Sequence, residues 1–428
     1  MANCAIVGIN WGDEGKGRMV DLLTSHYDIT VRYQGGGNAG HTVINDKGKF
    51  ALHLLPSGIF REGVVNILGN GVALDCENLY NEMESVRAAG VAITPENLKI
   101  SDRASLLLPW HRELDALEEQ RLKDKKYGST KQGIAPFYSD KYQKKTLQAG
   151  ELLYPEYLER HLADLLEWKN LILREVYHAK GYTMDEMMAW LDQYGGAVKA
   201  HIQDTSRYLR EAQKAGKSIL FEAQLGALRD LDYGIYPYTT SSNAVAAFAP
   251  VGSGLPSAKI DEVVGVVKAY SSCVGEGPFT CEWFGEEAEK LREAGAEYGA
   301  KTGRPRRVGP IDLVATRYGV ETQAATAIAL TKLDVLSSMK EIPVITGYKL
   351  DGVEVPRFDT LSDLDRMEPV VTMLPGWNRD ISGCKSWDDL PKEAKGYVEF
   401  LEQQLGHAIQ FISTGAERER FVLKGEWL

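Results

Sequence analysis

The N-terminus of the chain carries the feature that most restricts its fold, an apolar segment that leads straight into a glycine-rich turn. Residues 4–10 (CAIVGIN) predict a buried first strand, and Gly15, Lys16 and Gly17 lead into the amphipathic stretch 18–27. A strand, a glycine-rich turn and a helix in this order allow backbone N–H groups and a helix N-terminus to bind phosphate. The sequence therefore predicts a phosphate-binding loop that follows the first strand.

This loop departs from the usual P-loop pattern, in which Gly-Lys is followed by a Ser or Thr whose hydroxyl binds magnesium. Gly17 takes that place here, while Asp13 and Glu14 put carboxylates inside the loop. Lys16 can meet phosphoryl oxygens, and Asp13 can replace the missing hydroxyl as a magnesium ligand or act as a base on a bound substrate. The alternative is a glycine-rich turn with a helix-capping aspartate.

Further apolar segments alternate with helical ones. The strand candidates are residues 29–34, 64–72, 218–223, 262–272, 327–336 and 342–350, and the helical candidates are residues 77–89, 109–123, 155–178, 183–214 and 391–405. Such alternation favours an α/β fold with a large, mostly parallel central sheet flanked by helices, in a P-loop-like nucleotide-binding architecture. We expect a mostly helical insertion at about 101–215 and a C-terminal α+β extension at about 337–428.

Composition narrows the classes of protein to which the chain can belong. A formal net charge of −11 at pH 7 argues against a general nucleic-acid binder, since such proteins usually have a basic excess. Five scattered cysteines without CxxC spacing favour reduced thiols over a disulfide framework or a zinc site. There is no signal-peptide pattern and no apolar run that approaches the ~18 residues of a membrane span. We therefore expect a cytoplasmic protein that binds neither nucleic acid nor membrane.

A second glycine-rich loop follows the strand predicted at residues 29–34. In YQGGGNAGHT, residues 33–42, four glycines surround Asn38 and His41. Histidine is the side chain best suited to donate a proton near neutral pH. A lone histidine is more often structural, but its place in a glycine-rich loop beside a phosphate loop favours a functional His41.

Three further polar loops point to anionic substrates. TKLD, residues 331–334, has the Lys-x-Asp spacing with which GTP-binding proteins recognise guanine, whose N1–H and exocyclic amine both donate to the carboxylate. GAKTGRPRR, residues 299–307, has three arginines whose paired donors suit carboxylates and phosphates, although a solvated basic loop is the alternative. YGSTKQGIAP, residues 127–136, is typical of another anion-binding turn. Together the loops indicate two anionic substrates with a nucleotide, and favour GTP over ATP.

The chain resembles the adenylosuccinate synthetase family over nearly its whole length. The segments that carry the resemblance are WGDEGKG, RYQGGGNAGHT, LHLLPSGI, GNGV, GIYPYTTSSN, KAYSSCVGEGPF, TGRPRR, TKLDVL, LPGW and ISTG. Members of that family join IMP and L-aspartate at the expense of GTP, forming adenylosuccinate, GDP and phosphate in the first committed step of AMP synthesis from IMP. The resemblance implies a C–N-bond-forming ligase of purine biosynthesis in a single domain, residues 1–428.

The resemblance also implies catalytic roles. Asp13 would take the N1 proton of hypoxanthine and would bind Mg²⁺ together with the carbonyl of Gly40. The charged O6 would attack the γ-phosphate of GTP, and the amino group of aspartate would displace phosphate from the 6-phosphoryl-IMP so formed. His41 would hydrogen-bond the leaving β-phosphate side, Lys16 would neutralise the moving phosphoryl group, and Gln224 would contact the base. A carboxylate stands in the phosphate loop because the nucleophile is a weakly acidic purine lactam.

The substrate contacts implied by the resemblance form three larger sets. IMP would contact Asn38, Thr130, Lys144, Gln224, Thr240, Val274 and Arg304; aspartate would contact Gly299, Thr302, Arg304 and Arg306; and GTP would contact Gly12, Glu14, Gly15, Lys16, Gly17, Gly40, His41, Thr42, Arg306, Lys332, Asp334, Ser413 and Gly415. The family is dimeric. Lys144 stands where one subunit lends a basic side chain, usually arginine, to the phosphate of IMP bound in the other.

Several residues depart from the family pattern. Gly37 stands in GGGNAGHT where GGHNAGHT is usual, and we expect it to loosen that loop. FEGAQG appears as FEAQLG, which puts the base-contacting glutamine at Gln224 by residue type but at Leu225 by ungapped position. Lys301 adds a positive charge to the aspartate loop, and Glu276 replaces a small residue in VGEGPF. These departures indicate either a lineage variant or a shift in the amino-acid acceptor, and the retained catalytic residues favour the former.

Two other functions fit part of the sequence. A related synthetase that aminates a guanine nucleotide, GMP or dGMP, with aspartate could also use Asp13, but it would have to accommodate the 2-amino group. A GTP-dependent switch or scaffold would bind guanine nucleotide without forming a 6-substituted purine. Such a protein would need neither His41 nor the arginine loop.

Overall fold

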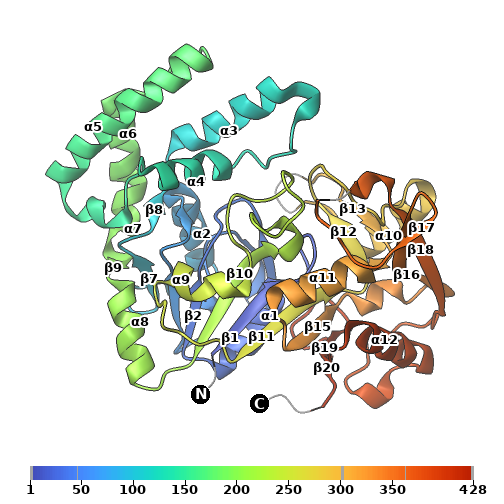
Figure 1. Cartoon of the computed structure of the whole chain (residues 1–428). Coiled ribbons are helices and arrows are strands. Elements are labelled where there is room, and N and C mark those ends of the chain that lie inside the picture. The colour runs from blue at the N-terminus through green and yellow to red at the C-terminus, as the bar shows by residue number, and fades with distance from the viewer. Residues whose placement is uncertain (1–2, 46, 300–302, 362, 426–428) are drawn as a thin grey trace.

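The computed structural model describes residues 3–45, 47–299, 303–361 and 363–425, and one large sheet forms its centre (Figure 1). The strands of this sheet are β1 Cys4–Gly8, β2 Ile29–Arg32, β5 Val65–Leu68, β7 Leu98–Ser101, β9 Ile202–Gln203, β10 Ile219–Gly226, β11 Glu262–Lys268, β15 Ala327–Thr331, β19 Ile409–Ser413 and β20 Phe421–Leu423. They lie in the order β20-β19-β15-β11-β1-β10-β2-β5-β7-β9. Neighbouring strands are parallel, except that β20 is antiparallel to β19. The large, mostly parallel α/β sheet expected from the sequence is confirmed.

Helices cover both faces of β1, which lies inside the sheet between β11 and β10. On one face Ile6 packs in an apolar cluster with Met19 and Val20 of α1 Lys16–Leu23. On the other face Ala5 and Val7 belong to the cluster that contains Val320 of α11 Leu313–Gln323. A parallel strand buried on both faces is apolar throughout, as residues 4–8 are.

The parallel order of the strands places the functional loops. The carboxyl ends of parallel strands meet at one edge of a sheet, where ligands of open α/β sheets bind. The loops that follow β1, β2, β10, β11 and β15 therefore converge at that edge. This brings the predicted phosphate loop beside residues 33–41.

The segment expected as a helical insertion lies beside β7 and β9 and consists mainly of helices (Figure 1). These helices are α3 Pro109–Leu122, α4 Ile134–Gln143, α5 Pro155–Leu171, α6 Met184–Trp190, α7 Gly196–Val198 and α8 Thr205–Lys214. The helical stretch predicted at residues 183–214 is interrupted by β9 between α7 and α8. The interruption has a local cause, because the Asp204 side chain accepts from the N–H of Arg207 and begins a new helix.

A second, four-stranded sheet contains β14 Ile311–Asp312, β16 Glu341–Leu350, β17 Val353–Val355 and β18 Glu368–Pro375. The strand predicted at residues 342–350 therefore forms in this small sheet and not in the central one. After α12 Lys392–Leu405, β19 and β20 return to the central sheet and complete its edge. The segment expected as a C-terminal extension thus contributes to both sheets.

The remaining elements connect these layers. They are β3 His41–Asn45, β4 Gly48–Leu52, β6 Ala73–Leu74, β8 Ser105–Leu106, β12 Ser271–Cys273, β13 Arg307–Gly309, α2 Cys76–Ala88, α9 Ala249–Ser253 and α10 Gly285–Gly295. Within the described ranges, none of the helices has the length and apolar character needed to cross a membrane.

Gly319 lies where α11 comes close to the segment that follows β1. Alanine variants of Gly319 and of Gly396 in α12 should therefore differ in stability. A Cβ at Gly319 would lie 2.1 Å from the carbonyl oxygen of Ile9, whereas a Cβ at Gly396 in α12 would meet no described heavy atom within 4 Å beyond its adjoining residues and the backbone of its own helix. We expect Gly319→Ala to lower the Tm, because overpacking costs about 1–3 kcal/mol. Gly396→Ala should raise the Tm, because alanine is favoured over glycine inside a helix by up to about 1 kcal/mol. Thermal unfolding followed by circular dichroism measures both, and shifts of the same sign would contradict this packing.

Candidate active site

The carboxylate of Glu14 organises the predicted phosphate loop from inside. Its Oε1 accepts hydrogen bonds from the backbone N–H groups of Asn10 at 3.1 Å and Gly12 at 2.8 Å, and its Oε2 accepts one from Lys16 Nζ at 2.6 Å. The side chains of Glu14 and Lys16 are only 2% and 3% exposed, so each buried charge has a partner. Glu14 was expected among the GTP contacts, but its carboxylate faces the loop itself.

The backbone of this loop explains its glycines. Gly12 and Gly15 have φ of 102° and 99°, and Asp13 between them has φ of 60°. A Cβ at Gly17 would lie 2.6 Å from the Cβ of His41. The hydroxyl of the usual P-loop is therefore absent for a steric reason, because the second glycine-rich loop occupies the space beside Gly17.

His41, at the start of β3, is oriented by a buried carboxylate. Its Nδ1 lies 2.6 Å from Oε1 of Glu222, which also accepts a hydrogen bond from the hydroxyl of Ser57 at 2.8 Å. Nε2 of His41 is buried and has no hydrogen-bond partner among the described residues. Burial lowers the pKa of His41, and the contact with Glu222 offsets this only in part. Burial also acts to raise the pKa of Glu222, but the hydrogen bond from His41 and the charge of Arg32 outweigh it, so this pKa is lowered.

Gln224 supports the second glycine-rich loop. Its Oε1 accepts from the N–H of Gly36 at 2.9 Å, and its Nε2 donates to the carbonyl groups of Gly36 at 2.8 Å and Ala39 at 3.0 Å. Both carbonyl groups accept from the NH₂ group of this fully buried amide. The side chain is thus directed at residues 36–39, whereas a contact with the base was expected of Gln224. Leu225 lies over the phosphate loop instead, with φ of 63° and its Cδ2 3.4 Å from the position of a Cβ at Gly12.

The space beside Gly37 is filled by the side chain of Asn78, and the loosening expected of this loop stays a prediction. A Cβ there would lie 2.6 Å from Nδ2 of Asn78. That amide donates to Oδ2 of Asp75 at 2.9 Å, which holds it in place. Asn78 thus occupies the space into which a side chain at position 37 would point.

Asp13, the expected base, pairs with an arginine of residues 299–307, the segment in which the aspartate contacts are expected (the aspartate loop). Its Oδ2 lies 3.2 Å from Nη2 of Arg306, and the side chain of Asp13 is 24% exposed. Nη1 of Arg306 donates to Oε2 of Glu297 at 2.7 Å. Burial acts to lower the pKa of Arg306, but the carboxylates of Asp13 and Glu297 outweigh it and raise this pKa.

The segment expected to recognise guanine contains an unsatisfied acceptor. Oδ1 of Asp334 is buried and lacks a hydrogen-bond partner in the described part of the chain. Burial raises the pKa of Asp334, and the charges of Lys332 and Arg18 oppose this. Arg18 also donates to the hydroxyl of Ser413 and to the carbonyl of Gly415, at 2.5 Å for the latter. Arg18, which the sequence did not single out, therefore joins the helix after the phosphate loop to the predicted guanine contacts.

Arg229 joins segments expected to contact IMP. Its carbonyl accepts from the N–H of Thr240 at 2.8 Å, and its Nη2 donates to the carbonyl of Val274 at 2.7 Å. The hydroxyl of Thr240 is buried without a partner among the residues described. The N–H of Glu276 donates to the carbonyl of Tyr127 at 3.4 Å, which brings in the loop that carries Thr130.

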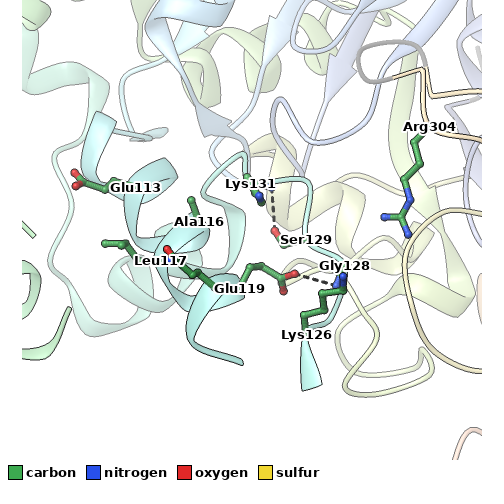
Figure 2. Close-up of a pocket in the computed structure, with 10 residues that line it drawn as sticks. Glu113, Ala116, Leu117, Glu119, Lys126, Gly128, Ser129, Lys131 and Arg304 are labelled. Carbon is green, nitrogen blue, oxygen red and sulfur yellow. Dashed lines mark hydrogen bonds between the residues drawn. The ribbon is translucent and has the colours of Figure 1, made fainter. Parts of the chain in front are cut away.

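A cavity of about 580 Å³ lies between α3 and residues 126–131, with Arg304 across from them (Figure 2). Asp115 of α3 fixes this loop, because it accepts from the Ser129 hydroxyl at 2.6 Å and from the Gly133 N–H at 2.8 Å. Figure 2 also shows Glu119 bonded to Gly128, at 3.2 Å. Thr130, an expected IMP contact, is exposed on this loop.

The expected aspartate contacts are only partly described. The N–H of Gly299 donates to the carbonyl of Arg304 at 2.8 Å, which closes the base of the loop. Nη2 of Arg304 lies 3.4 Å from Oε1 of Glu276, one of the residues that depart from the family pattern. Thr302 and Lys301 lie outside the described residues.

The remaining expected contacts lie in different parts of the molecule. Asn38 accepts from the N–H of Gly36 at 3.2 Å, and Thr42 is exposed on β3. Lys144 is exposed at the C-terminal end of α4, in the helical region (Figure 1). In the described residues no cluster of three or more His, Cys, Asp or Glu side chains could hold a metal ion. Asp13 and the carbonyl of Gly40 nevertheless suit Mg²⁺, which often binds proteins through few oxygens and takes its other ligands from phosphates and water.

Comparisons of sequence identify the family that the chain matches. A family model described as adenylosuccinate synthetase matches residues 5–422. The adenylosuccinate synthetase of Magnetococcus marinus is 44% identical over 427 residues, with 99% of this chain and 98% of the relative covered. Adenylosuccinate synthetase 2 of Pseudoalteromonas translucida is 46% identical over 426 residues, with 99% and 100% covered.

Comparisons of structure agree as well. The fully ligated adenylosuccinate synthetase from Plasmodium falciparum matches with a TM-score of 0.93 at 34% identity, covering 99% of this chain and 100% of that one. The succinoaminodeoxyadenylate synthetase of cyanophage S-2L, bound to dGMP and dATP, has a TM-score of 0.62 at 17% identity, covering 100% and 96%, and shares the fold alone. Because identity above 40% extends over nearly the full length of this chain and of its relatives, the chain belongs to the adenylosuccinate synthetase family.

Proposed function

We propose that this chain joins IMP and L-aspartate at the expense of GTP, forming adenylosuccinate, GDP and phosphate, and that residues around the phosphate loop perform the chemistry. One observation supports this choice of site. Asp13, Lys16 and His41 lie on two adjacent loops, and each is held by a different charged partner: Arg306 at 3.2 Å, Glu14 at 2.6 Å and Glu222 at 2.6 Å. A base, a cation and an imidazole held in this way suit phosphoryl transfer to a weakly acidic nucleophile.

In the proposed reaction Asp13 takes the N1 proton of IMP, which shifts negative charge to O6. O6 then forms a bond to the γ-phosphorus of GTP while the bond to the β,γ-bridging oxygen breaks. Lys16 offsets the charge that moves toward GDP, and so does His41 once the phosphates favour its imidazolium form, which donates from Nε2 while its Nδ1–H stays on Glu222. The amino group of aspartate next attacks C6, and the phosphate on O6 leaves with its electron pair.

Mg²⁺ is part of the proposal, with Asp13 and the carbonyl of Gly40 as its protein ligands. When bound, the ion would supply positive charge that neutralises the phosphates of GTP. The donor set fits, because a partly exposed carboxylate and a backbone carbonyl leave room for phosphate oxygens and water.

The substrate contacts belong to the same proposal. Asp334, with one buried oxygen unpaired in the described chain, would accept from N1–H and the 2-amino group of guanine, and Lys332, Ser413 and Gly415 would complete the guanine contacts. Thr240 offers a buried hydroxyl to IMP, together with Asn38, Thr130 and Val274. Arg304 and Arg306 would bind aspartate, joined by Gly299 and Thr302. Gln224 is reassigned as a support of residues 36–39.

A homodimer and a cytoplasmic location complete the proposal. Lys144 is exposed at the end of α4, which leaves its ammonium group free to reach IMP bound in a partner subunit. All five cysteines are buried free thiols, as expected for a reducing compartment.

Mass spectrometry of the products tests the proposed function directly. We expect adenylosuccinate from IMP, GTP and aspartate. Product from GMP or dGMP but not from IMP would instead support the guanine-nucleotide synthetase. Guanine-nucleotide binding without any 6-substituted purine would support the switch or scaffold.

Asp13→Asn separates the chemistry from the binding of nucleotide. The amide keeps the shape of the side chain but cannot take a proton, so we expect kcat to fall by about 10²–10⁴-fold, the usual contribution of a general base. GTP binding measured by calorimetry should survive. Turnover close to that of the unchanged protein would remove Asp13 from the proposed role.

Asp334→Asn tests the recognition of guanine. The substitution replaces one of the two carboxylate acceptors with a donor, and a hydrogen bond to a charged group contributes about 1.5–3 kcal/mol. We therefore expect the preference for GTP over inosine triphosphate, measured as a ratio of kcat/KM values, to fall by about tenfold or more. The assignment is wrong if this ratio stays the same.

A further inference from the structure

Glu297 is a buried carboxylate that none of the proposed chemical steps uses. It follows the C-terminal end of α10, and its side chain is fully buried. Burial acts to raise its pKa, but the charges of Lys268, Lys332 and Arg306 outweigh this and hold the pKa well below its usual range. Glu297 is therefore ionised in the interior of the protein, where an ion without partners would be very costly.

Four donors from three segments of the chain meet on this one carboxylate. Oε1 accepts from Lys268 Nζ at 2.8 Å, from Lys332 Nζ at 3.1 Å and from the hydroxyl of Tyr270. Oε2 accepts from Arg306 Nη1 at 2.7 Å. The backbone takes part too, because the Arg306 N–H donates to the carbonyl of Glu297 at 2.9 Å.

The donors to Glu297 come from two of the proposed subsites. Lys332 belongs to the guanine segment, and Arg306 belongs to the aspartate loop and reaches Asp13 at 3.2 Å. Lys268 and Tyr270 come from the end of β11 and from the residues after it, and a hydrogen bond from Lys268 to the Ser272 hydroxyl anchors that end. A carboxylate that served only to neutralise one buried cation would not need contacts with donors from several segments.

We propose that Glu297 is a positioning residue that couples the guanine subsite to the aspartate subsite, because its carboxylate holds Lys332 and Arg306 at the same time. This inference rests on the proposed function for the identity of the two ligands. Guanine that packs on the stem of Lys332 fixes the ammonium group on Oε1 of Glu297. The carboxylate is then fixed as well, and Oε2 holds Arg306 in the orientation that receives a substrate carboxylate.

Coupling of this kind is reciprocal, so each ligand tightens the binding of the other by the same factor. GDP and L-aspartate are the probes for a binding experiment, because they occupy the two subsites without turnover. Calorimetry would measure the Kd of aspartate with and without saturating GDP, and the Kd of GDP with and without aspartate. We expect the unchanged protein to show a factor of about 5 or more, within the usual range of coupling between sites.

Glu297→Gln removes the charge while keeping the shape of the side chain. We expect both Kd values to rise and the coupling factor to fall to within twofold of one. A factor that stays at its original value, or a factor of one in the unchanged protein, would overturn the proposal. If Glu297→Gln does not fold, Glu297→Asp keeps the charge and shortens the reach by one methylene, and it should also lower the factor; an unchanged factor there would overturn the proposal equally.

Two matched variants separate coupling from stability. Asp140 is also a buried carboxylate, bound to Lys169 Nζ at 2.5 Å and His111 Nε2 at 2.9 Å, but it lies in the helical region. Asp140→Asn should lower the Tm and leave the coupling factor unchanged. Tyr270→Phe removes only a neutral donor and should also leave the factor unchanged. An equal loss of coupling in Asp140→Asn would overturn the proposal, since the effect would then follow from stability.

The experiment distinguishes this proposal from the proposed function. Formation of adenylosuccinate by the unchanged protein tests the function alone and involves no variant. The coupling factor is measured by binding, without IMP and without chemistry. If the unchanged protein forms adenylosuccinate and Glu297→Gln keeps the original coupling factor, the coupling proposal is wrong and the proposed function is supported.

Discussion

The arrangement of the candidate active site depends on buried carboxylates that are each tied to a functional group. Glu14 holds Lys16, Glu222 holds His41 and Glu297 holds Arg306, and all three glutamates are at most 2% exposed. Removing one partner of a buried charge pair costs about 3–5 kcal/mol, because the other charge is left without compensation. Each glutamate therefore keeps its partner within hydrogen-bond distance and limits the orientations open to it.

Much of the fold could be predicted because it depends on local pattern. The apolar run of β1 and the glycines after it predict a strand, a loop and a helix, and the structure has them. The pairing of strands could not be predicted in the same way. Residues 342–350 have the apolar character of a central strand, yet they pair with β18 and β17 in a small sheet, because pairing is decided by contacts between segments far apart in the chain. The interruption of residues 183–214 was missed because a single capping aspartate, Asp204, has little weight beside a helical pattern.

The candidate site, like the fold, could be predicted where it depends on local pattern and not where it depends on contacts between distant segments. Motif residues such as His41 stand out because of their glycine-rich setting. The residues that support them do not stand out, because Glu222 lies in a mostly apolar strand and meets His41 only after folding. A charged residue inside a buried strand was the available signal. Gln224 presents a different difficulty, since its residue type suggested a contact with the base while its amide is bonded to Gly36 and Ala39.

Arg304 and Arg306, in the segment where the aspartate contacts are expected, differ in their own exposure and in the burial of a carboxylate partner. Arg304 is 55% exposed and meets Glu276, which is 39% exposed, at 3.4 Å. An exposed ion pair contributes about 0–1 kcal/mol, so the contact with Glu276 contributes little to the position of Arg304. Arg306 is 14% exposed and bound to Glu297 at 2.7 Å and to Asp13 at 3.2 Å. Arg304 thus lies where an anion from solvent can reach it, while Arg306 links Glu297 to Asp13.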